Sequence, residues 1–283
     1  MISDKDTNLL YLADCLPKKY PKFYKQFEKV LTECSIEFRF LPNTKDVWAV
    51  DYMPVQINRN NFTQFVYNPK YLKSKAGQKS ISDVESICKK INILPDKSKI
   101  FVDGGNVVKT TDKVIMCDRV FTENPNLSER ELIKKLEEIF QVSRIVFIPT
   151  YPKDFTGHAD GIVRFFDDTT VLINQYSRDA KKENIEFQRR LCLSLHNAGL
   201  DYIEIPYNPY NNKKYDQANG VYINFLQMED IIILPTFGFK EDNKTIKKFK
   251  ELFRNQKIAT VDSNDIANDG GVLNCITWNI QVN

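Results

Sequence analysis

A unit of two strands, one helix and one further strand recurs along the chain, and it limits the fold more than any other feature. The spacing of apolar residues predicts this unit over 99–150, 161–206 and 220–262, with a less complete copy before residue 99. The hairpin in each unit argues against a doubly wound sheet made of simple strand–helix–strand repeats. No Pro/Gly/Ser-rich linker interrupts the pattern, so we expect one α/β domain over 1–283, built from ββαβ modules.

Local signals place several elements. A helical stripe with Phe23, Phe27 and Leu31 predicts a helix over 20–34. Ser-x-x-Glu capping patterns at Ser82 and Ser128 predict the starts of two further helices. A fourth helix is expected over 183–198, ending at Gly199, and a hairpin over the turn at 167–168.

Composition excludes several classes of protein. The net charge is only +3, which gives no reason to expect nucleic-acid or membrane partners. No window of about 18 apolar residues exists, and the N-terminal stretch has acids where a signal peptide needs bases, so a cytoplasmic location is the default expectation. Six widely spaced cysteines without a CxxC pattern indicate neither a zinc ribbon nor a disulfide framework. The oligomeric state, including a homo-oligomer, stays open.

Two segments carry the side chains best suited to nucleophilic chemistry. His158 and Asp160 lie in TGHADGIVRFF, and in a strand their side chains would share one face. Cys275 lies in DGGVLNCITWNI, directly after a glycine pair that allows close backbone approach. Each also has a simpler interpretation, a polar residue at a strand edge or a buried structural cysteine.

Two further acids lie at strand ends. Asp103 stands before a glycine pair in FVDGGNVV, and Asp51 follows Trp48 in DVWAVDYMP. Either acid could simply form a turn or end a strand, and His196 fits a helix C-terminus. Together, a thiol, an imidazole and several carboxylates are the groups needed for nucleophilic attack on a cation. A pair of acids suits a planar guanidinium, because each carboxylate can form two hydrogen bonds with it.

Five motifs in order resemble one family. They are DVWAVDYMP (46–54), DGGN (103–106), GHADGIVRF (157–165), GVYINFL (220–226) and GGVLNCITW (270–278). From about residue 9 onward the chain is similar to the agmatine deiminase and bacterial-type peptidylarginine deiminase family, within the guanidine-modifying pentein superfamily. This resemblance implies a pentein propeller, with about five ββαβ modules around a pseudo-fivefold axis and an active site in the central channel.

The resemblance also implies roles for particular residues. Cys275 would be the nucleophile and His158 the general acid and base. Asp51 and Asp160 would clasp the guanidinium, and Asp103 would orient His158. The remaining substrate-binding positions would be Trp48, Asn106 and Gly271.

The implied activity is hydrolysis of an agmatine-like guanidine to a ureido product and ammonia through a covalent thiouronium on cysteine. For agmatine the product would be N-carbamoylputrescine, which leads toward putrescine synthesis. No cofactor and no metal are implied, and the expected partner is a small guanidinium molecule.

Three departures from the family pattern concern the substrate's tail. Val50 stands where relatives commonly carry Arg, Asn274 where many agmatine enzymes carry His, and the N-terminal Trp motif is absent. Deiminases of arginine or peptidyl-arginine, hydrolases of methylated arginine, amidinotransferases and a non-enzymatic pentein binder therefore remain alternatives. A Cys–His acyl hydrolase is disfavoured, because nearby acids would oppose an oxyanion, and scattered acids with one useful His make a poor metal site.

Overall fold

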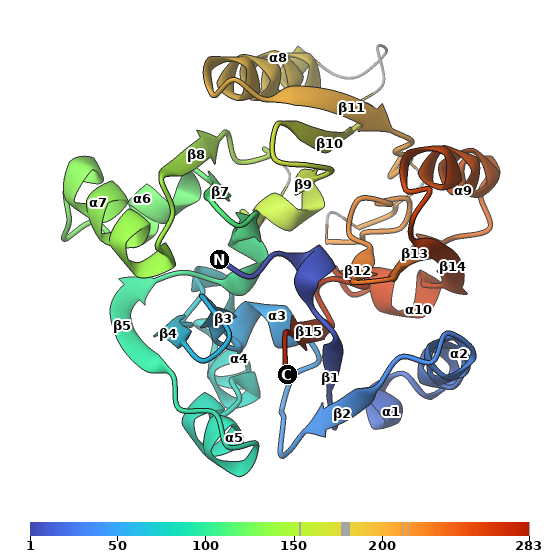
Figure 1. Cartoon of the computed structure of the whole chain (residues 1–283), viewed down its shortest axis with the longest axis horizontal. Coiled ribbons are helices and arrows are strands. Elements are labelled where there is room, and N and C mark those ends of the chain that lie inside the picture. Colours follow the sequence, from blue (N-terminus) through green and yellow to red (C-terminus); the bar gives the residue numbers. More distant parts are fainter. Residues whose placement is uncertain (153, 177–181, 211, 215, 283) are drawn as a thin grey trace.

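In the computed structural model, which describes residues 1–152, 154–176, 182–210, 212–214 and 216–282, five three-stranded sheets surround a common centre (Figure 1). In every sheet the middle strand pairs antiparallel with one neighbour and parallel with the other. The longer helices lie toward the outside of the ring, whereas a short helix lies near its centre (Figure 1). This arrangement confirms the expected pentein propeller of ββαβ modules.

Three sheets follow the predicted units closely. The first comprises β6 (Val108–Lys109), β7 (Lys113–Cys117) and β8 (Arg144–Ile148), with α6 (Arg119–Glu123) and α7 (Glu129–Phe140). The second comprises β9 (Val163–Phe165), β10 (Thr170–Asn174) and β11 (Asp201–Ile205), with α8 (Lys182–Asn197). The third comprises β12 (Leu226–Met228), β13 (Ile231–Thr236) and β14 (Lys257–Asp262), with α9 (Lys240–Leu252), and α10 (Asn264–Ala267) follows it.

Two further modules replace the single incomplete copy expected before residue 99. One is complete: β3 (Val55–Gln56), β4 (Phe62–Val66) and β5 (Asp96–Phe101), with α4 (Lys75–Ser80) and α5 (Val84–Lys90). The other joins both ends of the chain, because β15 (Thr277–Ile280) pairs with β1 (Leu9–Ala13), which pairs with β2 (Phe38–Leu41). Its helices are α1 (Leu16–Lys19) and α2 (Pro21–Glu33). The sequence pattern did not reveal this module, because its strands come from opposite ends of the chain.

The middle strands of the five sheets are largely buried in the core. Residues 114–117 of β7 are fully buried, and residues 9–13 of β1 are almost completely buried. Strands flanked on both faces read as continuous apolar runs rather than as alternating patterns. On α2 the predicted stripe of Phe23, Phe27 and Leu31 faces this core.

Most local signals are confirmed, with two corrections. Ser128 caps α7 with a capping box, and Gly199 follows α8 with a φ of +71°. Ser82, however, is not the cap of α5: Asp83 is, accepting a hydrogen bond from the Ser86 N–H at 3.0 Å. The Ser82 hydroxyl instead accepts from the Lys45 N–H at 2.9 Å, so a tertiary contact outcompeted the capping box.

The second correction concerns residues 158–160, which form no strand. His158 is extended and precedes a 3-10 turn, η4 (Ala159–Gly161). A comparable turn, η3 (Gly104–Asn106), follows Asp103, and the short helix α3 (Ala49–Tyr52) follows Trp48. Each of these tight turns precedes the first strand of a module and lies near the centre of the ring (Figure 1).

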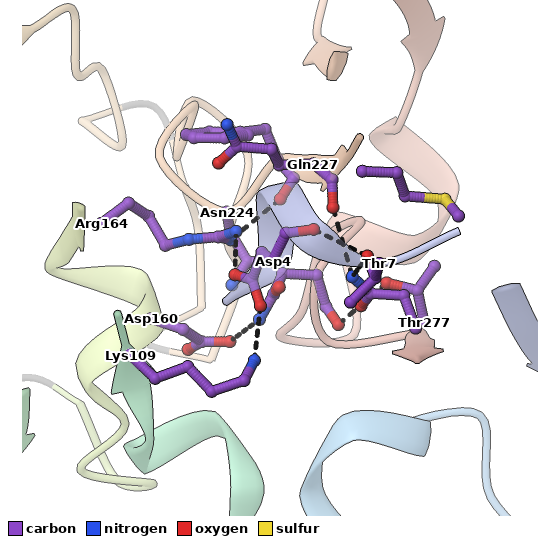
Figure 2. Close-up of polar contacts among 12 residues, drawn as sticks. Asp4, Thr7, Lys109, Asp160, Arg164, Asn224, Gln227 and Thr277 are labelled. Atoms are coloured by element: carbon purple, nitrogen blue, oxygen red, sulfur yellow. Dashed lines mark hydrogen bonds and ion pairs between the residues drawn. The ribbon is translucent and has the colours of Figure 1, made fainter. Parts of the chain in front are cut away.

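The N-terminal segment lies across one end of the centre. Its 3-10 turn, η1 (Asp4–Asp6), presents Asp4 to two cations (Figure 2): Lys109 Nζ lies 2.5 Å from one carboxylate oxygen and Arg164 Nη2 lies 2.7 Å from the other. Arg164 is almost completely buried and also donates to the Phe225 carbonyl at 2.9 Å. Burial would raise the pKa of Asp4, but Lys109 and Arg164 outweigh it and hold that pKa below its usual value.

No helix in the described part of the chain is long and apolar enough to cross a membrane.

We expect Asp4→Ala to lower the free energy of unfolding by about 2–4 kcal/mol, because it leaves buried Arg164 without its carboxylate. Urea unfolding at pH 7 measures this. The depressed pKa of Asp4 means that its contribution is present above the ordinary carboxyl pKa and is lost as the pH falls through its folded value. The difference between wild type and variant should therefore shrink below about pH 4. A variant within 0.5 kcal/mol of wild type at pH 7, as expected for a surface change such as Asp230→Asn, would contradict this account.

Candidate functional site

One cavity of about 550 Å³ brings together six of the eight residues to which the sequence assigns roles. Its lining includes Trp48, Asp51, His158, Asp160, Gly271 and Cys275. They come from separate modules: the turn before α3, the turn at η4, and the segment that precedes β15. A cavity of this size is within the usual range for small-molecule sites.

A buried imidazole lies between two carboxylates. His158 Nε2 lies 3.2 Å from Asp103 Oδ2, and its Nδ1 lies 3.5 Å from Asp51 Oδ1. Burial would lower the pKa of His158, but the charges of Asp51 and Asp103 outweigh it and raise that pKa to about 10. The ring is therefore an imidazolium near neutral pH, with both N–H groups directed at acids.

Asp103 lies behind His158, outside the set of cavity-lining residues, and so contacts the imidazole only from its far side. Asp51 lines the cavity and also accepts a hydrogen bond from the Gly105 N–H at 3.1 Å. Burial raises the pKa of Asp51 to about 8, with His158 opposing and Asp160 and Asp103 adding to the shift. The empty site therefore holds more acid than its single imidazolium balances.

The thiol lies beside the third carboxylate. Cys275 Sγ is 3.7 Å from Asp160 Oδ2, and that same oxygen accepts a hydrogen bond from Asn274 Nδ2 at 2.7 Å. Burial raises the pKa of the Cys275 thiol well above its ordinary value, and the charges of Asp160 and Asp51 raise it further. Burial also raises the pKa of Asp160, although His158 and Asn274 act against this.

Two glycines make the close packing of the site feasible. A Cβ on Gly105 would lie 2.5 Å from His158 Nδ1 and 2.7 Å from Asp51 Oδ1. A Cβ on Gly271 would lie 2.3 Å from Cζ3 of the Trp48 ring. Real Cβ atoms do not approach so closely, so the glycine pairs noted in the sequence fit the imidazole and the indole against bare backbone.

The structure shows the contacts of two residues that depart from the family pattern. Asn274, through its hydrogen bond to Asp160, takes part in fixing that carboxylate. Val50 lines a second, small cavity of about 40 Å³, which Asp160 also lines and where Lys109 and Arg164 supply positive charge around Asp4. The Val50 N–H donates to the Cys275 carbonyl at 3.3 Å, which ties the Trp48 segment to the thiol segment.

Asn106 is placed differently from the expectation. Its side-chain oxygen accepts from the Cys117 N–H at 2.7 Å, its amide donates to the Cys117 carbonyl at 3.5 Å, and it is not among the residues that line the large cavity. Both polar atoms of this amide are thus directed at the backbone of Cys117, the last residue of β7. A buried amide needs partners, and here the neighbouring strand provides them. His196 lies in the last turn of α8, also away from the cavity lining.

Sequence reasoning overlooked Asn224, which lines the cavity. Its side-chain oxygen accepts a hydrogen bond from the Cys275 N–H at 3.3 Å (Asn224 is labelled with Asp160 in Figure 2). The sequence did carry a signal for Asn224. A single amide stands inside the apolar run VYINFL, and a polar group buried in such a run needs a hydrogen-bond partner.

Among the described residues, no group of three or more His, Cys, Asp or Glu side chains is arranged to hold a metal ion.

Known proteins share this fold and sequence pattern. The "Putative agmatine deiminase" of Mycoplasma capricolum is 26% identical over 208 residues, which cover 63% of this chain and 55% of that protein. The matched part thus spans about half the length of the relative. The structure titled "C. Jejuni Agmatine Deiminase" aligns over 100% of this chain and 96% of its own with a TM-score of 0.80 at 20% identity. An amidinotransferase from Microseira wollei aligns with a TM-score of 0.64 at 12% identity, over 99% and 96% of the two chains.

The pattern of the Porphyromonas-type peptidyl-arginine deiminase family matches residues 15–280. This span contains every strand of the five sheets except β1, the middle strand of the sheet that joins both ends of the chain, and it contains all of the residues around the imidazolium and the thiol. The chain therefore belongs to the Porphyromonas-type peptidyl-arginine deiminase family.

Proposed function

We propose that the protein is a guanidine deiminase, which hydrolyses an agmatine-like guanidinium to a ureido product and ammonia through a covalent intermediate on Cys275. One observation supports this most strongly. The thiol of Cys275 lies 3.7 Å from a buried carboxylate, in a cavity shared with an acid-clamped imidazolium. A thiol, an imidazolium and carboxylates in one cavity suit nucleophilic attack on the central carbon of a planar cation.

Binding depends on the excess of acid. Asp51 and Asp160 face a common cavity and have raised pKa values, so the empty site retains protons that a cation would displace. A guanidinium between them would hydrogen-bond both carboxylates, since its planar fork matches carboxylate geometry. The Trp48 ring, fixed against Gly271, provides a flat apolar surface beside that cation.

Substrate charge would also prepare the nucleophile. In the empty site burial and the two acids keep the Cys275 thiol protonated. A bound guanidinium neutralises those acids and lowers the pKa of the thiol, so the thiolate forms where its target carbon lies. The thiol therefore stays protonated, and so weakly nucleophilic, until substrate binds.

The reaction proceeds in two halves. The sulfur forms a bond to the guanidinium carbon, the His158 imidazolium gives its proton to the departing nitrogen, and the C–N bond breaks to release ammonia. Neutral His158 then takes a proton from water as the oxygen bonds to the thiouronium carbon. The C–S bond breaks, and the proton on that oxygen passes to the departing sulfur, which gives the ureido product and the Cys275 thiol. Asp103 acts by holding the ring in place through its far nitrogen.

A deiminase of arginine or peptidyl-arginine is the second candidate, favoured by the family to which the chain belongs. A panel of agmatine, arginine, an arginine peptide and a methylated arginine, scored for ammonia and for ureido product, separates these. Release of an alkylamine would instead indicate a methylarginine hydrolase, and no product with any guanidine would indicate a binding protein.

Cys275→Ala should abolish ureido production while the protein still binds the guanidine, because the acids that hold the cation remain. Product assays and titration calorimetry measure the two properties. Cys192→Ala, on α8, is the matched control and should behave as wild type. Ureido product from the Cys275 variant would reject the nucleophile assignment.

The pH profile of kcat/KM should be bell-shaped on the alkaline side of neutrality. Activity should rise toward about pH 8 as Asp51 ionises and can hold the cation, and fall above about pH 10 as His158 loses the proton that the leaving nitrogen needs. Ammonia release from pH 6 to 11 tests this. A profile governed by one group near pH 6.5, as for an unperturbed histidine, would contradict the clamped imidazolium.

Gly105→Ala should lower kcat/KM by about 100-fold, since a methyl group there must displace His158 or Asp51, and small misplacements of reacting groups cost about that much. Gly199→Ala, after α8 and outside the cavity lining, is the control for an added methyl group: a Cβ there meets no atom within 4 Å, and its φ of +71° would lower stability without reaching the site. Melting curves verify that both variants fold. Equal activity of the two variants would show that the close approach at Gly105 does not matter.

A further inference from the structure

Arg164 is a guanidinium of the protein itself, and it lies close to one of the acids proposed to bind the substrate. Its side chain is almost completely buried. Arg164 and Asp160 both line the cavity of about 40 Å³ (both are labelled in Figure 2), and Asp160 also lines the large cavity that contains Cys275. One carboxylate of the proposed substrate site therefore shares a cavity with a guanidinium that can compete with the substrate.

The hydrogen bonds of Arg164 go to partners other than Asp160. Nη2 donates to Asp4 Oδ2 at 2.7 Å and Nη1 donates to the Phe225 carbonyl at 2.9 Å, while Cζ lies 4.6 Å from the centre of the Phe225 ring. The charge of Arg164 nevertheless acts on Asp160. Burial raises the pKa of this carboxyl, and the charges of His158 and Arg164 act in the opposite direction.

Arg164 needs a carboxylate partner. A buried guanidinium without one is strongly destabilising, and its planar fork fits a carboxylate whether it belongs to a substrate or to the protein. Asp4 meets this need, because its Oδ2 atom lies against Nη2. If Asp4 loses its charge, Asp160 is the remaining carboxylate among the residues that line the small cavity. An ion pair between Arg164 and Asp160 would then occupy the acid that the substrate needs.

The N-terminal segment fixes the position of Asp4 independently of its ion pairs. Thr7, which directly follows η1, donates through its hydroxyl to the Asp4 carbonyl at 2.7 Å. Asn279 Nδ2 donates to that hydroxyl at 2.7 Å, and the Glu229 N–H donates to the Thr7 carbonyl at 3.1 Å. These contacts attach η1 to β15 and to the turn after β12, so a neutral residue at position 4 should keep the local backbone.

The second cation beside Asp4 depends on it less. Lys109 Nζ lies 2.5 Å from Asp4 Oδ1, and the Lys109 side chain is 16% exposed, against 3% for Arg164. Water can therefore solvate Lys109 once Asp4 is neutral, whereas Arg164 is shielded from water. Loss of the Asp4 charge should thus move Arg164, rather than Lys109, toward Asp160.

We infer that Asp4 keeps the Arg164 guanidinium from occupying Asp160, so that this carboxylate stays free for the guanidinium of a substrate. Asp4 is thus a positioning residue, which acts through Arg164 and does not touch the substrate. This inference rests on the proposed guanidine deiminase function, and it extends the site to the N-terminal segment on the far side of Asp160.

The test measures agmatine affinity by calorimetry in a Cys275→Ala background at about pH 8, where Asp51 ionises. Asp4→Asn should weaken binding by about 10- to 100-fold, the effect of losing one charge-assisted contact. Asp4→Asn combined with Arg164→Met should restore the affinity to within about threefold, because the competing guanidinium is gone. Asp4→Asn combined with Lys109→Met is the matched control and should stay weak.

Alkylation of Cys275 by iodoacetamide gives a second readout that needs no guanidine. Burial and the charge of Asp160 raise the pKa of this thiol. An ion pair between Arg164 and Asp160 would offset that charge, so Asp4→Asn should speed alkylation at about pH 8 by about 3- to 10-fold. Adding Arg164→Met should reverse the gain. Peptide mass spectrometry separates Cys275 from the other cysteines.

Unchanged agmatine affinity and unchanged alkylation in Asp4→Asn would overturn the inference, and so would an equal loss of affinity in the Arg164→Met double variant. Melting curves verify that each variant folds. If Asp4→Asn does not fold, Asp4→Ser, whose smaller side chain admits water beside Arg164, replaces it throughout. If wild type binds no guanidine, the proposed function fails, and the alkylation series still decides whether Arg164 turns to Asp160.

Discussion

The site depends on a single buried arrangement, the His158 imidazolium held between Asp51 and Asp103. A charged ring out of water is tolerated only where acids surround it, and acids in such number are tolerated only with a cation among them. Asp51 and Asp103 therefore keep the ring protonated, and the ring in turn limits the rise in the pKa of Asp51. The backbone has adapted to this demand, because Gly105 leaves room for the ring and donates its N–H to Asp51.

The site retains more acidic groups than its one imidazolium can balance, and this excess favours the binding of a cation. One imidazolium cannot offset Asp51, Asp103 and Asp160, so the pKa of Asp51 rises to about 8 and that of Cys275 rises far above the ordinary thiol value. A cation completes the balance. Electrostatics thus links recognition with activation: the group that binds is the group whose charge releases the sulfur for attack.

Much of this could be predicted from the sequence, because short-range patterns carried it. The ββαβ units, the α7 capping box and the motifs around His158 and Cys275 are all local signals. Their spatial meeting came from the resemblance rather than from spacing, and the roles proposed for the residues stay predictions. What sequence could not supply were partners set by tertiary contacts: Ser82 bonded to Lys45, Asn106 bonded to the end of β7, and Asn224 at the Cys275 backbone. In each case a polar side chain took a partner distant in sequence, which no local pattern encodes.

The pairing of β1 with β15 matches Leu9 with Ile280 and thus joins residues from opposite ends of the chain. Such a long-range contact costs a large loop-closure entropy, and strand pairings of this kind are slow to form. Cys275 stands two residues before β15, so the sulfur reaches the cavity only when this last sheet is completed. Nascent or truncated chains would carry the imidazole and its acids without a nucleophile, and reactivity toward guanidines would arise at one moment, the closing of the ring.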